Sequence, residues 1–188
     1  MKVIDQQTTI DKKRTQRCVS FTYNGWQLLF DKEFICFWFA RIINECPRPS
    51  DFLIRGYLIQ PEMAYLIMEG NSSSFRSFYH SLNKFTKAML ASYLRMEDNP
   101  EKNIINYFKT IQDEKSPMYQ IAQIRNSDYQ NVLLYEPLIY KFHNYSFNHF
   151  YKCAIDSHFC SRIDYAGGTG PIVIDKIHET SGTDKMEP

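Results

Sequence analysis

The chain has 188 residues, a length that suits one domain with a substantial hydrophobic core and is short for two. Its hydrophobic content of 44% is that of a globular protein, and no apolar run approaches the roughly 18 residues that span a membrane. The formal net charge is +1, so the chain has no global attraction for nucleic acid and any basic surface must be local. Its 5 cysteines lack a C-x-x-C pair, and no signal peptide precedes them, so we expect free thiols and a cytoplasmic protein.

The N-terminal third predicts an arm, a strand and a helix. Residues 1–16 are polar and are expected to form a flexible arm. Cys18–Tyr23 alternates and is rich in β-formers, so it predicts the first strand. Asp31 is a suitable N-cap for a helix that runs to Asn44, with Phe34, Phe37 and Trp38 expected on one face.

The stretch from Phe52 to Arg95 predicts a hairpin followed by a long helix. Two apolar runs, Phe52–Ile59 and Met63–Met68, are separated by a short turn with a proline, as in adjacent antiparallel strands. A polar break at residues 70–74 then supplies N-cap residues for a helix over Ser73–Leu94.

This long helix has an apolar side and a basic side. Its apolar residues recur at intervals of three and four, the spacing of a helix that packs on a sheet: Phe75, Phe78, Leu82, Phe85 and Met89. At about 100° per residue, its basic residues fall on nearly the opposite face: Arg76, His80, Lys84 and Lys87. We expect these four to be the nucleic-acid-binding residues, because cations on one exposed face can contact phosphates. The alternative is a solvated outer face with no ligand.

The order of strand, helix, hairpin and helix predicts an α+β fold. We expect an antiparallel sheet with helices packed on one face, followed by a C-terminal helical and irregular extension. The domain is expected to cover residues 17–178, and residues 179–188 are expected to form a flexible tail.

Two segments carry a resemblance to a known family. Residues 56–69 read GYLIQPEMAYLIME and residues 81–87 read SLNKFTK. This strand, turn, strand and basic helix resemble the core of the single-tyrosine HUH transposases, especially the REP-associated tyrosine transposase branch. The resemblance implies a ferredoxin-like sheet and single-stranded or hairpin DNA as the partner, and we also expect a homodimer. Low Gly and Ala with abundant Ile, Asn, Lys, Tyr and Phe suggest a bacterial source. In the family, the activity is nicking and joining of single-stranded DNA.

The residues that match the family's metal ligands differ from the family pattern. The family places two histidines on one strand, where alternation points both imidazoles to the same face, and they hold a divalent cation. Met63 and Tyr65 occupy those positions here. A thioether and a neutral phenol are poor ligands for Mg²⁺ or Mn²⁺, so we expect no cofactor. Either ion would be required only if activity survived with non-standard residues.

The nucleophile position also differs. The family's catalytic tyrosine aligns with Lys141, whereas His143 and His149 match family histidines. Tyr140 and Tyr145 are the nearby aromatic hydroxyls, and with His143 they are the remaining catalytic candidates.

The sequence therefore predicts a transposase-like DNA-binding protein without strand-cleavage activity. One alternative is a non-catalytic module for protein interaction or dimerisation on the same fold, which the near-zero net charge favours. A second alternative is an active DNA transposase or nuclease that uses non-standard residues.

Overall fold

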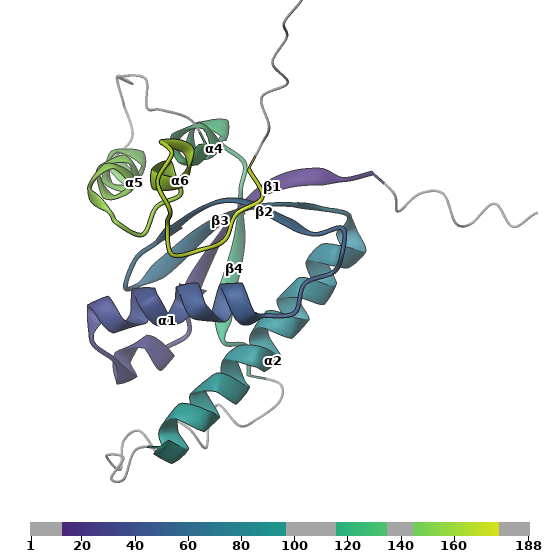
Figure 1. Cartoon of the computed structure of the whole chain (residues 1–188), viewed down its shortest axis with the longest axis vertical. Coiled ribbons are helices and arrows are strands. Elements are labelled where there is room, and N and C mark those ends of the chain that lie inside the picture. The colour runs from purple at the N-terminus through teal and green to yellow at the C-terminus, as the bar shows by residue number, and fades with distance from the viewer. Residues whose placement is uncertain (1–12, 97–115, 135–144, 177–188) are drawn as a thin grey trace, which may run out of the picture.

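The computed structural model describes residues 13–96, 116–134 and 145–176. Tyr140 and His143 lie outside them, as do most of the predicted N-terminal arm and the predicted tail. The elements follow one another along the chain as β1 (Thr15–Tyr23), α1 (Lys32–Glu45), β2 (Leu53–Ile59), β3 (Met63–Gly70), α2 (Ser72–Met96), β4 (Tyr119–Ile124), α4 (Ser127–Leu134), α5 (Tyr145–Asp156) and α6 (Arg162–Tyr165) (Figure 1).

The four strands form one antiparallel sheet in the order β2-β3-β1-β4. β2 and β3 are the predicted hairpin, and β1 lies between β3 and β4 with Val19 opposite Leu66 and Gln123. Each helix, α1 or α2, thus joins two strands that lie on either side of a third strand, which is the split βαβ arrangement of ferredoxin-like sheets. The predicted α+β class is confirmed.

One face of the sheet is covered by α1 and α2 (Figure 1). The larger hydrophobic core lies between these layers, and Phe75, Phe78 and Leu82 of α2 are fully buried in it. Phe85 and Met89 pack against the same core and are half-buried. The predicted apolar side of the long helix is therefore the side that packs on the sheet.

The first helix begins as predicted but presents a different face. Asp31 is its N-cap, and the carboxylate accepts a hydrogen bond of 2.8 Å from the backbone N–H of Phe34. Phe37, expected to face inward, is 56% exposed, whereas Trp38 is buried. The prediction for Phe37 was wrong because the buried stripe lies one step round the helix and includes Phe39.

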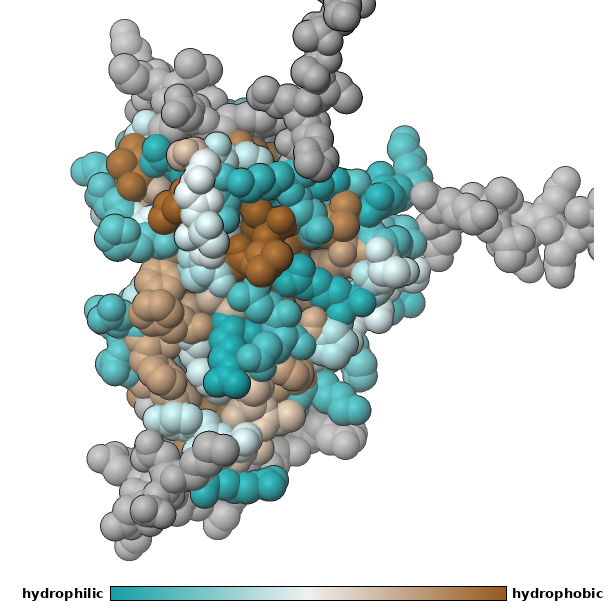
Figure 2. All heavy atoms as spheres, in the orientation of Figure 1, coloured by the Kyte–Doolittle hydropathy of each residue, from teal (hydrophilic) through white to brown (hydrophobic). Residues whose placement is uncertain are grey.

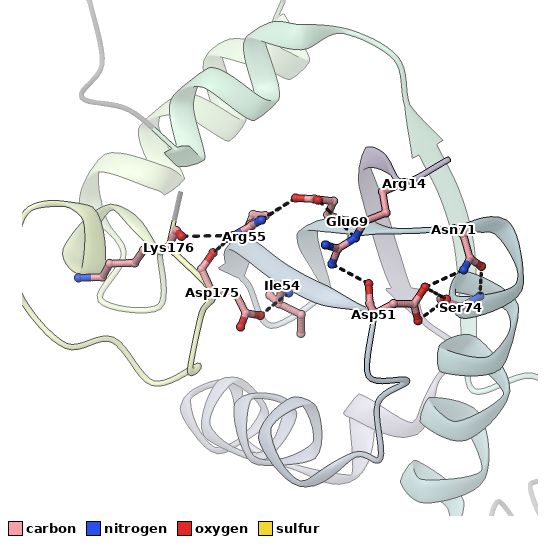
Figure 3. Close-up of polar contacts among 9 residues, drawn as sticks. All are labelled: Arg14, Asp51, Ile54, Arg55, Glu69, Asn71, Ser74, Asp175 and Lys176. Carbon is pink, nitrogen blue, oxygen red and sulfur yellow. Dashed lines mark hydrogen bonds and ion pairs between the residues drawn. The ribbon is translucent and has the colours of Figure 1, made fainter. Parts of the chain in front are cut away.

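A buried polar cluster fixes the start of α2 (Figure 3). Asn71 is the residue before the helix, and its side-chain oxygen accepts a hydrogen bond of 2.9 Å from the backbone N–H of Ser74. The carboxylate of Asp51, which precedes β2, accepts hydrogen bonds from the Asn71 amide and from the Ser74 hydroxyl. The direction of α2 is thus tied to the start of the hairpin.

The opposite face of the sheet is covered by the C-terminal extension. A second hydrophobic cluster forms where Leu58 and Ile67 on the sheet meet helices α4 and α5. Its buried helical members are Val132, Leu133, Leu134, Phe147, Phe150 and Ala154. Both faces of β2 and β3 are consequently buried, which explains why these two strands read as continuous apolar runs in the sequence.

The same extension closes the outer edge of β2. The backbone N–H of Ile59 donates to the carbonyl of Phe159 at 2.9 Å, and that of Asp175 donates to the carbonyl of Ile54 at 2.8 Å. Arg55 lies at a bulge in β2 and forms an ion pair of 2.7 Å with Glu69 of β3, while also donating to the carbonyl of Asp175 (Figure 3).

The molecular face shown in Figure 2 is mostly hydrophilic at its centre, apart from one hydrophobic patch there.

Strand β4 forms the other edge of the sheet, and the sequence did not predict it. Its residues, YQIAQI, carry no charge, and positions 120–123 are exposed. Within residues 13–96, 116–134 and 145–176, no strand pairs with its outer side. The strand was missed because exposure on both faces removes the alternation by which strands are recognised.

No described helix is both long enough and apolar enough to cross a membrane. Four of the cysteines, Cys18, Cys36, Cys46 and Cys160, are buried as free thiols, and Cys153 is half-buried.

We expect Phe78→Ala to lower the free energy of unfolding by about 3–5 kcal/mol, because it removes a ring stacked on Phe52 in the core. The neighbouring Ser77 is exposed, so Ser77→Ala should change stability by less than about 0.5 kcal/mol. Urea unfolding of both variants measures the difference. Equal effects would mean that α2 does not pack on the sheet as described.

Candidate nucleic-acid interface

The outer side of α2 is a continuous exposed stripe. Its exposed residues recur at intervals of three or four, so they line one side of the helix: Ser73, Arg76, Ser77, His80, Lys84, Ala88, Ser92 and Arg95. We call this set the α2 stripe. At about 100° per residue, its charged members and His80 lie within about 100° of arc, opposite the buried residues. The inward packing of Phe78 and Leu82 therefore forces Arg76 and Lys84 outward.

The α2 stripe is electrostatically one-sided. The 25-residue helix contains no Asp or Glu, so all of its charged side chains are cations. No carboxylate of the described residues forms an ion pair with Arg76 or Lys84. Lys87, which the sequence placed with the other three, falls within the same arc but is half-buried. Arg95 was not among the predicted binding residues, although the same spacing would have included it.

The positions that match the family's metal ligands lie on the opposite face of the sheet, beneath the C-terminal extension. The ring of Tyr65 lies 4.8 Å from the ring of Phe150 and 6.2 Å from that of Tyr129, measured between centroids. Burial raises the pKa of Tyr65 to about 12, so its phenol is neutral at physiological pH. Met63 is half-buried two residues before it on the same strand. The described residues contain no group of three or more His, Cys, Asp or Glu side chains placed to hold a metal ion.

The remaining catalytic candidates are not brought together by the described residues. Tyr145 is the first residue of α5 and is 87% exposed. His149, one turn further along, is exposed, and its Nε2 atom lies 3.7 Å from the Cys153 thiol. Burial raises the pKa of that thiol, which disfavours the nucleophilic thiolate. Among the described residues of α5, the one thiol beside a base is therefore disfavoured as a nucleophile, and no hydrogen bond joins Tyr145 to His149.

Comparisons of the chain with family models, with curated protein sequences and with solved structures gave no match.

The environment of Tyr65 predicts an effect on stability at alkaline pH. In the unfolded chain the phenol ionises near its ordinary pKa of about 10, whereas in the folded state it keeps its proton until about pH 12. The contribution of Tyr65 to stability is therefore constant below about pH 10 and falls between pH 10 and 12, by about 1 kcal/mol at pH 11.

Tyr65→Phe should remove that part of the alkaline loss, seen as a smaller decrease in Tm between pH 9 and pH 11. Tyr145→Phe is the matched control, because the exposed Tyr145 ring should leave the profile of the parent protein unchanged. The same pH profile for all three proteins would contradict a buried phenol at position 65.

Proposed function

We propose that this protein binds nucleic acid through the α2 stripe and does not cleave it. The observation that carries the proposal is the arrangement of α2: a long helix with no acidic residue, anchored at its start and held with its cations facing solvent. A polyanion is the ligand class that complements such a surface.

The net charge of the chain supports a local interface. With 22 basic and 21 acidic side chains, the protein has almost no net charge, yet α2 carries only cations. A helix face that only contacts water normally carries charges of both signs, so a helix with cations alone differs from that pattern.

The absence of cleavage in this proposal rests on ligand chemistry and packing. The half-buried Tyr65 packs against the rings of Tyr129 and Phe150, and Met63 offers only a soft thioether, so neither position supplies the hard donor that a divalent cation needs at a phosphate. The resemblance of residues 56–69 and 81–87 to HUH transposases supports DNA as the nucleic acid.

Charge reversal on the stripe tests the proposal. If Arg76, Lys84 and Arg95 each contact a phosphate, the logarithm of affinity should fall with the logarithm of salt concentration at a slope of about −3. Arg76→Glu with Lys84→Glu should reduce the slope to about −1 and weaken binding to all sequences alike. Fluorescence anisotropy with labelled DNA measures both quantities.

The matched control is Lys32→Glu with Lys152→Glu, which makes the same charge change at exposed positions on α1 and α5. This control variant should retain most of the DNA affinity and most of the salt dependence of the parent protein. Equal weakening by both pairs would indicate a response to net charge, and unchanged binding by the stripe variant would contradict the proposed interface.

One observation favours a second candidate, a protein-interaction module that forms a homodimer. The edge strand β4 is uncharged, and no strand of the described residues pairs with its outer side, whereas the outer edge of β2 is hydrogen-bonded to the C-terminal extension. Natural sheets usually protect an open edge with charge or proline, so an uncharged edge suits pairing with a second copy. In a two-fold pair no like charges would meet.

Lysines at Ile121 and Gln123 would place charge on this edge, and both positions are exposed. If β4 pairs with its symmetry mate, Ile121→Lys with Gln123→Lys should convert a dimer into a monomer without loss of folding. Sedimentation velocity with circular dichroism measures both. A parent protein that is monomeric at high concentration would rule out a homodimer formed through β4.

A further inference from the structure

The α2 stripe lacks the exposed Phe, Tyr and Trp rings by which proteins commonly hold single-stranded nucleic acid. Bases of a single strand are commonly bound by stacking on exposed aromatic rings. The five aromatic residues of α2 are all buried or half-buried: Phe75, Phe78, Tyr79, Phe85 and Tyr93. Tyr79 and Tyr93 meet other rings of the protein, with centroids 6.0 Å from Phe21 and 5.0 Å from Phe30. The stripe therefore offers cations, hydroxyls and the imidazole of His80, but no exposed Phe, Tyr or Trp ring for an unpaired base.

The shape of the stripe also bears on the ligand. Its cations are separated along the helix by short side chains, Ser77 before His80 and Ala88 and Ser92 after Lys84. Short residues leave the helix backbone open to close approach. Arg76, Lys84 and Arg95 span 19 residues, which corresponds to about 28 Å along the helix axis.

A helix of this form has the dimensions of a DNA groove. With its side chains an α-helix is about 10–12 Å across, and the major groove of B-form DNA is about 12 Å wide. The 25 residues of α2 extend about 37 Å. Figure 1 shows that the C-terminal half of α2 runs past the ends of the strands, so the helix projects from the body of the sheet. The major groove of A-form RNA is too narrow for such an element.

We propose that the ligand of the α2 stripe is duplex DNA and that the stripe enters its major groove, an inference that rests on the proposed nucleic-acid binding. Arg76 and Lys84 are long enough to reach guanine edges or the flanking phosphates, while Ser77 and Ala88 let the helix approach the groove floor. The sequence predicted single-stranded or hairpin DNA as the partner. This proposal specifies the double-stranded stem of a hairpin as the part that binds.

The test compares four probes of one sequence, about 20 base pairs or nucleotides long. They are the DNA duplex, its single strand, the corresponding RNA duplex, and a DNA duplex in which every cytosine carries a glucosylated 5-hydroxymethyl group. The sugar fills the major groove without adding charge. The unmodified duplex should bind about tenfold more tightly than each of the other three at the same salt concentration.

The stripe variant Arg76→Glu/Lys84→Glu separates this inference from the proposed function. If glucosylated and unmodified duplexes bind equally, or the single strand binds as tightly as the duplex, the groove proposal is overturned. If the stripe variant still weakens binding in that case, phosphate binding by α2 stands. If no probe binds at low salt, both proposals fail.

Discussion

The structure depends on the packing of α2 against the sheet. Phe78 stacks on Phe52 with centroids 4.3 Å apart, and Leu82 lies fully buried one turn further along. A helix can turn only one side to a sheet, so this packing also decides which residues face the solvent. The cap formed by Asn71 and Asp51 fixes where the helix begins. The orientation of the cations is thus a consequence of the core.

The two sides of the sheet differ in the residues that they present. On the face away from α1 and α2, the half-buried Tyr65 packs against aromatic rings of helices α4 and α5. This packing stabilises the extension, and it leaves a hydrophobic environment where the resemblance to HUH transposases would place two histidines. The proposed binding surface lies on the other side of the molecule, where the outer side of α2 is polar and cationic.

Much of the fold followed from local patterns in the sequence. The hairpin, the Asp31 cap and the inward side of α2 were predictable because each depends on spacing within one element. The edge strand β4 and the place of the C-terminal extension were not, since both depend on contacts between residues far apart in the chain. Phe37 was predicted to be buried because an aromatic residue at helical spacing usually is, but it is exposed.

The candidate interface was predictable in part. The spacing of Arg76, His80 and Lys84 indicated an outer basic side, but the sequence alone could not show that Lys87 is half-buried. Nor could it show that every Phe and Tyr ring of α2 is buried or half-buried, which is the observation that favours a duplex over a single strand. Exposure depends on neighbouring elements and becomes visible only in the folded chain.

Amide chemical-shift mapping by NMR, with and without duplex DNA at low salt, tests the central claim most directly. The account predicts that the largest shifts fall on the α2 stripe between Arg76 and Arg95, with β4 and α5 little changed. Shifts concentrated on β4 or on α5, or no shifts at all, would contradict it.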